Sequence, residues 1–577
     1  MRIHAITLPL ILAAAAPLAA QTTPPLGAPP LPVQAASHID EHMRRLVPFG
    51  FSGAVLVAYR GSVLLDRGYG MADAEKSLAA TPETVFYIGS IAKQFTAAAI
   101  LKLEAEGRLS VTDRISRFFP QAPADKAGIT LHQVLTHTAG LPEYMPGRDD
   151  QPLERDAAVR WILAEPLIGP VGGEFAYSNA GYTLLAAVVE VVSGTGYEPF
   201  LREKFFLPAG MLHTGRVLPD WSGSTVAVGS NGGRRMAPPL ERPAMADGPS
   251  WNVRGAGGLM STTGDLLRWA QALHGGRLLP AAQLAKMTTG GVRLDPGGRN
   301  LAGYGGVKVT FPDGRRAFGI AGGDGTFNAI LTHYADGYVV VAASNVGERP
   351  VESQGRVLNA LLFGGPYQAP PVAAQVDPAA LAGLAGTYRL PTGGTVRLAA
   401  DGGRVRMTAE GQDALDALAA RPLPADRSAG LNARAREMLE AAERGDFAPL
   451  HAAFGGQVPL EEVRQAHTRF TDAMEQELGA LQGIDVVGSV DAGELVRTLV
   501  RYRLERGTRL LRMGWAGGAL AGMQPVRDLP ATTVVPVAPG ELAAYDFMTG
   551  RTQRLRIRGA ALVIDTASGE VAAAREG

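Results

Sequence analysis

Two short motifs bring together the side chains that could activate a serine for nucleophilic attack. Ser90 and Lys93 form a Ser-x-x-Lys motif, Tyr177 and Asn179 form a Tyr-x-Asn motif, and each motif occurs once in the chain. Residues three apart lie on the same face of a helix, so Lys93 can reach the Ser90 hydroxyl. A serine hydroxyl is a poor nucleophile until a base takes its proton. The pair therefore indicates acyl transfer through a covalent serine intermediate.

The proposed base works only as a neutral amine, which sets a condition on its surroundings. Burial and a positive helix N-terminus both lower the pKa of a lysine, and we expect both at Lys93. A tyrosine hydroxyl near an ammonium ionises more easily, so we expect Tyr177 to pass protons. Asn179 offers an acceptor for Lys93 and a donor for a substrate carbonyl.

A purely structural interpretation of the same residues is also available. Ser90 could be a helix N-cap, Lys93 an exposed helix charge, and Tyr177 a packed ring beside the turn residue Asn179. Ser-x-x-Lys alone is a weak signal. The joint occurrence of both motifs, in this order, favours the catalytic interpretation.

The elements that must position these residues form one mixed α and β block, residues 37–365. Alternating apolar residues and turn signals at Arg60-Gly61 and Asp336-Gly337 predict a hairpin near each end of it. The expected elements are a helix around Met43, strands at 53–59, 63–67, 329–334 and 338–344, and helices at 91–106 and 184–192. We expect the terminal strands to share one antiparallel sheet.

Further segments of the block make it resemble a known family. They are residues 131–142 (LHQVLTHTAGLP), 257–266 (GGLMSTTGDL) and 322–327 (GGDGTF). Together with the two motifs, and in the right order over the whole block, they resemble the class C β-lactamase-related family of serine hydrolases. That family also contains low-molecular-weight penicillin-binding peptidases, esterases and D-aminopeptidases.

The resemblance implies a serine β-lactamase-like fold of the α/β (α+β) class. In it an antiparallel sheet packs with helices and a helical subdomain, and the site lies between them. It implies that Ser90 is the nucleophile, that Lys93 and Tyr177 share general-base and general-acid duties, and that Asn179 positions the substrate. The oxyanion hole would use the backbone N–H groups of Ser90 and Gly323. One such donor stabilises a transition state by roughly 2.7–4 kcal/mol.

One departure from the family pattern bears on the substrate. The third motif normally begins with Lys or His, followed by a small residue and Gly, but here the triplet is Ile320-Ala321-Gly322. Gly322 and Gly323 can preserve the backbone shape, but the group that helps to bind a substrate carboxylate is missing. An ester or amide without that carboxylate is therefore favoured over a β-lactam. Arg316 could compensate, or it could be a surface charge at a strand end.

Other polar residues are assigned structural roles. His137 is expected to make structural hydrogen bonds, and His274, before two glycines, is expected to end a helix. The chain has no His-Glu-x-x-His motif, no Gly-x-Ser-x-Gly elbow and no phosphate loop. We therefore expect neither a metal nor a cofactor.

The N-terminus and the overall composition bear on location and partners. Residues 1–20 resemble a secretory signal peptide and residues 21–36 a flexible leader, so we expect a periplasmic or secreted protein. The chain has no cysteine, which excludes a cysteine-anchored lipoprotein and disulfides. The rest of the sequence contains no run of 18 consecutive apolar residues, so we expect no stable membrane insertion. Lys+Arg and Asp+Glu number 55 each, which argues against a nucleic-acid partner.

The C-terminal third differs in composition and in its expected secondary structure. Residues 366–378 are rich in Gly, Pro and Ala and are expected to be a linker, followed by a β-rich and α+β accessory region, residues 379–577. Residues 381–390 resemble the start of a small lipocalin-like domain, and residues 433–454 weakly resemble a nuclear-transport-factor-like module. A structural appendage and a ligand-binding module both remain open.

The sequence as a whole predicts an exported serine hydrolase that cleaves an ester, amide or peptide bond through a Ser90 acyl-enzyme. One alternative is a β-lactamase or a D,D-carboxypeptidase-type penicillin-binding protein. Another is a catalytically silent binding protein that uses the same cleft. The expected partner is a small-molecule or peptide substrate, and the sequence does not predict an oligomeric state.

Overall fold

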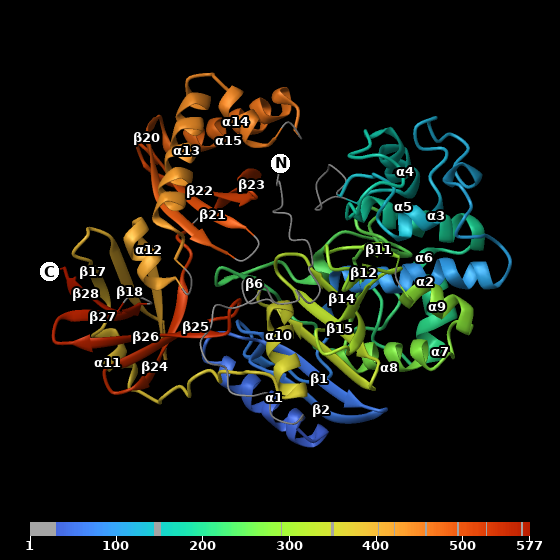
Figure 1. Cartoon of the computed structure of the whole chain (residues 1–577), viewed down its shortest axis with the longest axis horizontal. Coiled ribbons are helices and arrows are strands. Elements are labelled where there is room, and N and C mark those ends of the chain that lie inside the picture. Colours follow the sequence, from blue (N-terminus) through green and yellow to red (C-terminus); the bar gives the residue numbers. More distant parts are fainter. Residues whose placement is uncertain are drawn as a thin grey trace. The chain divides into compact units, whose positions relative to one another are not determined.

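The computed structural model divides into two compact units, one ending at Tyr367 and one beginning at Gln368 (Figure 1). The structure describes residues 30–143, 152–289, 291–347, 351–401, 403–419, 422–455, 458–492, 495–526, 528–566 and 569–576. The expected signal peptide and residues 21–29 of the expected leader lie outside the described residues.

An eight-stranded antiparallel sheet forms the frame of the N-terminal unit. Its order is β11-β12-β13-β14-β15-β16-β1-β2. The strands are β11 (Val292–Arg293), β12 (Asn300–Ala302), β13 (Val307–Thr310), β14 (Arg316–Gly323), β15 (Asn328–Tyr334), β16 (Tyr338–Ser344), β1 (Gly53–Tyr59) and β2 (Ser62–Tyr69). β1 pairs with β16 from Gly53↔Ser344 to Tyr59↔Tyr338, which confirms that strands from both ends of the block share one sheet.

Helices cover the central strands on both sides. α1 (Pro32–Leu46) and α10 (Val351–Phe363) contact each other, with α1 on β2 and α10 on β15 and β16, whereas α8 (Thr263–His274) contacts β16 and β1 (Figure 1). β1 is buried from Gly53 to Ala58 because both of its faces are covered, which explains its nearly continuous apolar sequence.

The first helix begins earlier than the sequence predicted. α1 starts at Pro32, so the last five residues of the expected leader are helical. Proline is favoured in the first turn, where its missing N–H has no intrahelical acceptor anyway. Ala35 and Ala36 are buried, so this turn packs with the unit.

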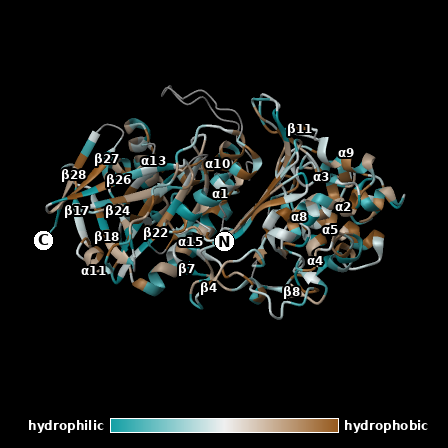
Figure 2. Cartoon of the chain, turned by 90° about the horizontal axis from the view of Figure 1, so that it is seen from below, coloured by the Kyte–Doolittle hydropathy of each residue, from teal (hydrophilic) through white to brown (hydrophobic). Residues whose placement is uncertain are grey.

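A mostly helical region continues the core beside the sheet. It contains α2 (Ala92–Ala105), α3 (Leu131–Leu135), α4 (Arg155–Ala164), α5 (Asn179–Ser193), α6 (Tyr197–Leu201), α7 (Leu207–Ala209) and α9 (Ala281–Thr289). α2 and α5 pack against each other and are buried along most of their length, and Figure 2 shows α5 and its neighbours largely in the hydrophobic colour. A helix that is apolar all round belongs in a core, so the first turns of α2 and α5 are held rigidly.

The described helices are short or too polar to be clear membrane spans. None of them is by itself long and apolar enough to cross a bilayer, and one bent pair, Asn179–Ser193 with Tyr197–Ala209, passes by length and composition only.

The C-terminal unit contains a closed eight-stranded barrel. Its strands are β17 (Gly386–Arg389), β18 (Thr395–Asp401), β19 (Arg404–Glu410), β24 (Thr532–Ala538), β25 (Glu541–Asp546), β26 (Arg551–Arg558), β27 (Ala561–Thr566) and β28 (Gly569–Arg575). β17 pairs with β28 and closes the barrel, after the short helix α11 (Pro378–Ala382). Alternating burial along β18 gives the barrel a core of its own, and both colours alternate along the barrel strands in Figure 2.

An α+β module is inserted into this barrel between β19 and β24. It comprises α12 (Gln412–Leu418), α13 (Ala425–Glu443), α14 (Ala448–Ala453), α15 (Leu460–Leu478) and the sheet β20 (Leu481–Asp491), β21 (Val496–Leu504), β22 (Gly507–Ala516) and β23 (Ala519–Val526). Helices α13, α14 and α15 share a second core with one face of this sheet. The smaller β-rich C-terminal region expected from the sequence is therefore a barrel with an inserted module in which helices pack on one face of a sheet.

Candidate active site

Ser90 lies in a tight turn that leads directly into the buried helix α2. The turn, Gly89–Ile91, is a 3₁₀ segment, and Gly89 adopts φ +51°. A Cβ at Gly89 would lie 2.4 Å from the Gly323 nitrogen, and a Cβ at Gly322 would lie 2.5 Å from the Ser90 nitrogen. Glycine at both positions lets the turn approach β14 closely, so the backbone nitrogens of Ser90 and Gly323 come together.

Lys93 stands one turn further along α2 and reaches back to the serine. Its Nζ lies 3.0 Å from Ser90 Oγ, 2.6 Å from Asn179 Oδ1 and 2.8 Å from the carbonyl oxygen of Ala256. Its side chain is only 1% exposed, and all three of these neighbours are electrically neutral. The exposed-charge interpretation of Lys93 is therefore wrong.

The charge state of this lysine follows from those surroundings. Burial lowers the pKa of Lys93 well below its usual value, and the Glu143 carboxylate opposes that effect less strongly. A neutral amine has two protons and one lone pair. It can donate to Asn179 Oδ1 and to the Ala256 carbonyl while it accepts from the Ser90 hydroxyl. The arrangement therefore equips Lys93 to take the serine proton.

Tyr177 approaches the same oxygen from the other side. Its hydroxyl donates to Ser90 Oγ at 2.8 Å, and Lys93 Nζ lies 4.8 Å from its ring centroid. Burial raises the pKa of Tyr177, outweighing the bond to Ser90, so the expectation that it ionises easily is wrong. The physical reasons are the burial of the hydroxyl and, less strongly, the nearby Glu143 carboxylate, both of which raise the pKa of Tyr177. Tyr177 is therefore a neutral proton donor in the resting site.

Asn179 is placed by the first turn of α5. The Ser178 hydroxyl caps this helix by accepting the Gly181 N–H at 2.8 Å. The Asn179 N–H donates to the Glu143 carbonyl at 2.8 Å, which fixes the backbone while the side chain reaches Lys93. The structure thus brings Ser90, Lys93, Tyr177 and Asn179 into one hydrogen-bonded cluster.

The third motif lines the same site without a charged side chain. β14 packs on the serine turn, and Gly322 and Gly323 are its last two residues. Ile320 is buried in the apolar core that also contains the residues around Ser90. Arg316 is exposed at the opposite end of the strand, four residues or roughly 13 Å away, so it does not replace the missing cation.

The two histidines weighed in the sequence take structural positions. His137 Nδ1 accepts the Ser178 N–H at 2.9 Å, and its ring stacks between Tyr177 and Tyr182. Burial lowers its pKa well below the usual value, with Lys93 adding to the effect, so it stays neutral. His274 is the last residue of α8 and stacks on His333, as expected for a residue that ends a helix.

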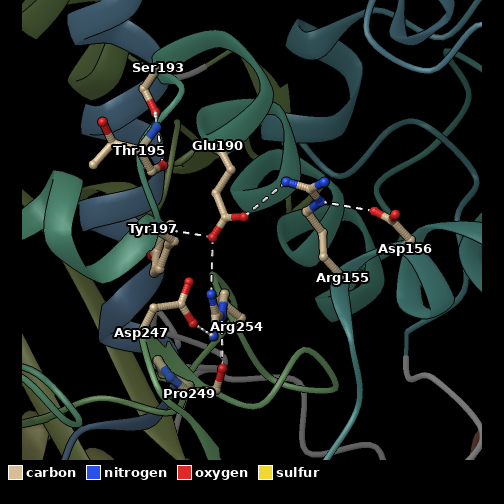
Figure 3. A network of polar contacts seen from close by, with 9 residues as sticks. All are labelled: Arg155, Asp156, Glu190, Ser193, Thr195, Tyr197, Asp247, Pro249 and Arg254. Atoms are coloured by element: carbon tan, nitrogen blue, oxygen red, sulfur yellow. Dashed lines mark hydrogen bonds and ion pairs between the residues drawn. The ribbon is translucent and has the colours of Figure 1, made fainter.

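The sequence did not reveal the support behind Lys93. Arg254 is fully buried and donates to Glu190 at 3.0 Å, to Asp247 at 2.9 Å and to the Pro249 carbonyl at 2.8 Å (Figure 3). Glu190 also binds Arg155 at 3.3 Å. The network anchors the chain just before the Ala256 carbonyl that Lys93 uses. The Gly-rich run from residue 255 to 258 was the available signal for a close backbone approach.

The carbonyl next to Ala256 is fixed as well. The Thr96 hydroxyl donates to the Gly255 carbonyl at 2.6 Å, and Gly255 has φ +80°. A Cβ there would lie 2.5 Å from the Tyr182 carbonyl oxygen, so only glycine fits. Residues 254–256 are therefore held from both sides.

Comparisons with known proteins identify the family of the chain. A family model described as "Beta-lactamase" matches residues 40–364. Penicillin-binding protein 4* of Bacillus subtilis is 28% identical over 388 residues, which is 63% of this chain and 84% of that protein. A putative penicillin-binding protein, PbpX, of the same organism is 32% identical over 43% of this chain and 61% of its own length.

A solved structure extends the likeness in fold. The octameric penicillin-binding protein homologue from Pyrococcus abyssi is 18% identical and covers 93% of this chain and 99% of its own, with a TM-score of 0.52. The family match covers more than half of the chain and includes Ser90, Lys93, Tyr177 and Asn179. The chain therefore belongs to the Beta-lactamase family and is a serine hydrolase of that family.

Proposed function

We propose that this protein is an exported hydrolase that cleaves an ester, amide or peptide bond through a Ser90 acyl-enzyme. The observation that carries the proposal is the 3.0 Å contact between Ser90 Oγ and a buried Lys93 whose two hydrogen-bond acceptors, Asn179 Oδ1 and the Ala256 carbonyl, are neutral. A lysine in these surroundings is poised to accept a proton rather than to hold a charge.

The first chemical step follows from these contacts. Lys93 takes the proton of Ser90 as Oγ forms a bond to the substrate carbonyl carbon, and the carbonyl oxygen becomes an oxyanion. The backbone N–H groups of Ser90 and Gly323 stabilise that oxyanion. Tyr177 then gives its hydroxyl proton to the leaving alcohol or amine as the bond to carbon breaks. The Lys93 ammonium returns a proton to Tyr177, which leaves an ester on Ser90.

The second step releases the acyl group. A water molecule attacks the ester carbonyl and loses a proton to Lys93, which forms a second oxyanion that the N–H groups of Ser90 and Gly323 stabilise again. The bond between carbon and Ser90 Oγ then breaks, and the proton returns to the serine. Lys93 is therefore the base in both steps, and in this step its ammonium supplies the proton that Ser90 Oγ regains.

The third motif narrows the substrate class. Ile320 places an apolar side chain where related enzymes carry a cation or an imidazole, and Arg316 is too distant to replace it. A substrate that must be held by a free carboxylate would find no charged partner from this strand. We therefore favour an ester or an amide that lacks a carboxylate near the scissile bond.

Hydrolysis of a p-nitrophenyl ester of a short acid by the purified protein tests the proposal. Ser90→Ala should abolish release of p-nitrophenol, and a fluorophosphonate probe should label the wild type but not the variant. Labelling without hydrolysis of esters or amides would move the assignment to a narrow peptidase. Absence of both would favour the silent binding protein.

The penicillin-binding alternative has its own test. The names of the two Bacillus relatives describe penicillin binding for those proteins. Fluorescent penicillin should label this chain weakly or not at all, because Ile320 cannot pair with the carboxylate of the drug. Stoichiometric labelling at Ser90 would instead favour the β-lactamase or D,D-carboxypeptidase alternative.

Export is a separate part of the proposal. It rests on the resemblance of residues 1–20 to a signal peptide. Expression of the full chain in a Gram-negative host, followed by N-terminal sequencing of the periplasmic fraction, should find a new terminus at or close to Gln21. Retention of Met1 in a cytoplasmic product would contradict export.

A further inference from the structure

The inserted module of the C-terminal unit contains two arginines that differ from their neighbours. On β21, Arg501 pairs with Glu410 at 2.9 Å, and Arg503 pairs with Asp485 at 2.6 Å. Arg497 lies on the same strand, and within the described part of the chain no hydrogen bond or ion pair reaches its side chain. Arg512, on β22, donates to the neutral side chain of Gln524. Two guanidinium groups therefore lack a carboxylate where their neighbours have one.

The strand register places these two arginines side by side. Arg497 lies opposite Gly514, and Leu499 lies opposite Arg512, so Arg497 and Arg512 are diagonal neighbours on one face of the sheet. Gln524 lies opposite Arg512 on the next strand and completes the row. This face is opposite to the one that α13, α14 and α15 cover, because Val496, Val500 and Tyr502 belong to that core.

Beside Arg497 no side chains project from the sheet over two neighbouring positions, because both are occupied by glycine. Gly514 lies opposite both Arg497 and, on its other side, Gly522. Among the residues that the structure describes, a Cβ placed on Gly514 would have only the Leu495 side chain, at 3.5 Å, and the Gly522 carbonyl oxygen, at 4.0 Å, within 4 Å. A group of a few atoms can therefore approach the arginines over the glycine backbone.

The two charges are also poorly solvated. Arg497 and Arg512 are half-buried, and Leu499 and Leu510 beside them belong to a small buried apolar cluster. Burial lowers the pKa of both guanidinium groups, and Arg497 lowers that of Arg512 further, to about 10. Like charges held together out of water are unfavourable unless an anion joins them.

We propose that Arg497, Arg512 and Gln524 form a binding site for a small oxyanion, a carboxylate or a phosphate, on the face of the β20–β23 sheet opposite to the three helices. Two planar guanidinium groups can each donate two parallel hydrogen bonds to such a group, and the Gln524 amide can supply a further donor. The site belongs to the C-terminal unit and does not include Ser90, so the proposal gives this accessory unit a ligand-binding function. The proposal can be confirmed or refuted independently of the proposed hydrolase activity.

Equilibrium dialysis of the full-length protein tests the site with two probes. Radiolabelled inorganic phosphate and radiolabelled succinate are used in separate arms, with sodium chloride holding the ionic strength constant. We expect one equivalent of at least one probe to bind. Arg497→Gln and Arg512→Gln should each weaken it by at least about tenfold, and Arg497→Lys by less, since lysine keeps the charge without the planar fork. Arg503→Gln is the matched control and should change binding less than about twofold.

The thermal midpoint without ligand gives a second readout that a structural role would not produce. Arg497→Gln removes a repulsion, so it should leave the midpoint unchanged or raise it, whereas loss of a structural arginine would lower it. Binding of phosphate alone identifies a phosphate-bearing ligand, and binding of succinate alone identifies a carboxylate. Binding of neither probe, or equal binding by the wild type and Arg497→Gln, would overturn the proposal.

Discussion

Two buried cations in the N-terminal unit have opposite surroundings. Lys93 is 1% exposed and contacts a hydroxyl, an amide oxygen and a carbonyl, all neutral. Arg254 is 0% exposed and contacts two carboxylates, those of Glu190 and Asp247. Both side chains act on the same backbone segment, since Lys93 binds the carbonyl of Ala256, two residues after Arg254.

The difference shows how partners, rather than burial alone, decide what a cation can do. A guanidinium with carboxylates stays charged and ties together segments that are distant in the sequence. An amine with neutral acceptors loses its proton and becomes a base. The domain uses the first arrangement to hold the second in place.

Replacing the lysine at position 93 by arginine should have the largest effect on activity. Lys93→Arg puts a permanently protonated group where a base is required, and arginine cannot accept the Ser90 proton. We expect kcat/KM for an ester substrate to fall by about 10²–10⁴-fold, the range of general-base contributions. Lys286→Arg, an exposed lysine paired with Glu104, is the control and should keep full activity. More than a tenth of wild-type activity in Lys93→Arg would refute the assignment of Lys93 as the base.

The pH dependence should follow from the depressed pKa of Lys93. Above that lowered pKa the folded protein has a neutral Lys93, whereas the unfolded chain keeps its proton up to about 10.5. Folding therefore releases a proton in this interval, so the free energy of unfolding rises with pH there and the contribution is lost on acidification. His137 behaves likewise, but only below its usual value of 6.5.

Measurements above pH 7 isolate the contribution of Lys93. We expect kcat/KM to reach its plateau well below pH 10.5, and Tyr177, whose pKa is raised, to keep its proton across the plateau. Chemical denaturation between about pH 7 and 9 should give a smaller rise in stability for Lys93→Met than for the wild type. An activity profile that rises only near pH 10 would show that Lys93 is charged in the resting enzyme.

Removing the ion pairs of Arg254 should lower the free energy of unfolding more than it lowers the catalytic rate. Arg254→Met removes one partner of Glu190, which keeps Arg155, and the partner of Asp247, which is partly exposed. We expect the free energy of unfolding to fall by more than about 1 kcal/mol but by less than the roughly 3–5 kcal/mol of a fully uncompensated buried charge. Arg44→Met removes an exposed pair with Asp40 and should lower it by less than about 1 kcal/mol. Urea unfolding followed by tryptophan fluorescence measures both. Equal losses would show that the Arg254 network is not a structural anchor.

The same comparison explains which parts of the site the sequence could predict. Ser90, in the 3₁₀ turn before α2, and Lys93, in the first turn of α2, are three residues apart, and Tyr177 lies just before the start of α5. The spacing within each motif, and the occurrence of both motifs together, therefore made these residues predictable. The Ala256 carbonyl carries no side-chain signal, and Glu190, Asp247 and Arg254 meet only because α5 and a distant loop pack together. Sequence spacing reveals local contacts, whereas such tertiary pairs depend on the completed fold.

The fold shows the same division between local and distant information. The hairpin of β1 and β2 was predictable from alternating apolar residues around Arg60 and Gly61. The barrel was not, because its strands β19 and β24 are neighbours separated by the whole inserted module. The start of α1 at Pro32 was also missed, since the proline-rich segment before it concealed the burial of Ala35 and Ala36.

The smallest effect is expected where a new titratable group enters the apolar wall of the site. Ile320→His restores an imidazole to the third motif, but Ile320 packs in the core, where burial lowers the pKa of a histidine. By the comparison of Lys93 with Arg254, such a group stays neutral at pH 7 and acts only as a hydrogen-bond donor. The ratio of kcat/KM for a peptide with a free carboxylate to that for its methyl ester should then rise by about two- to tenfold. Ile320→Leu, which adds no donor, should leave the ratio unchanged. A rise of more than about a hundredfold would mean that this wall supports a full charge without a carboxylate, contrary to the behaviour inferred for Lys93.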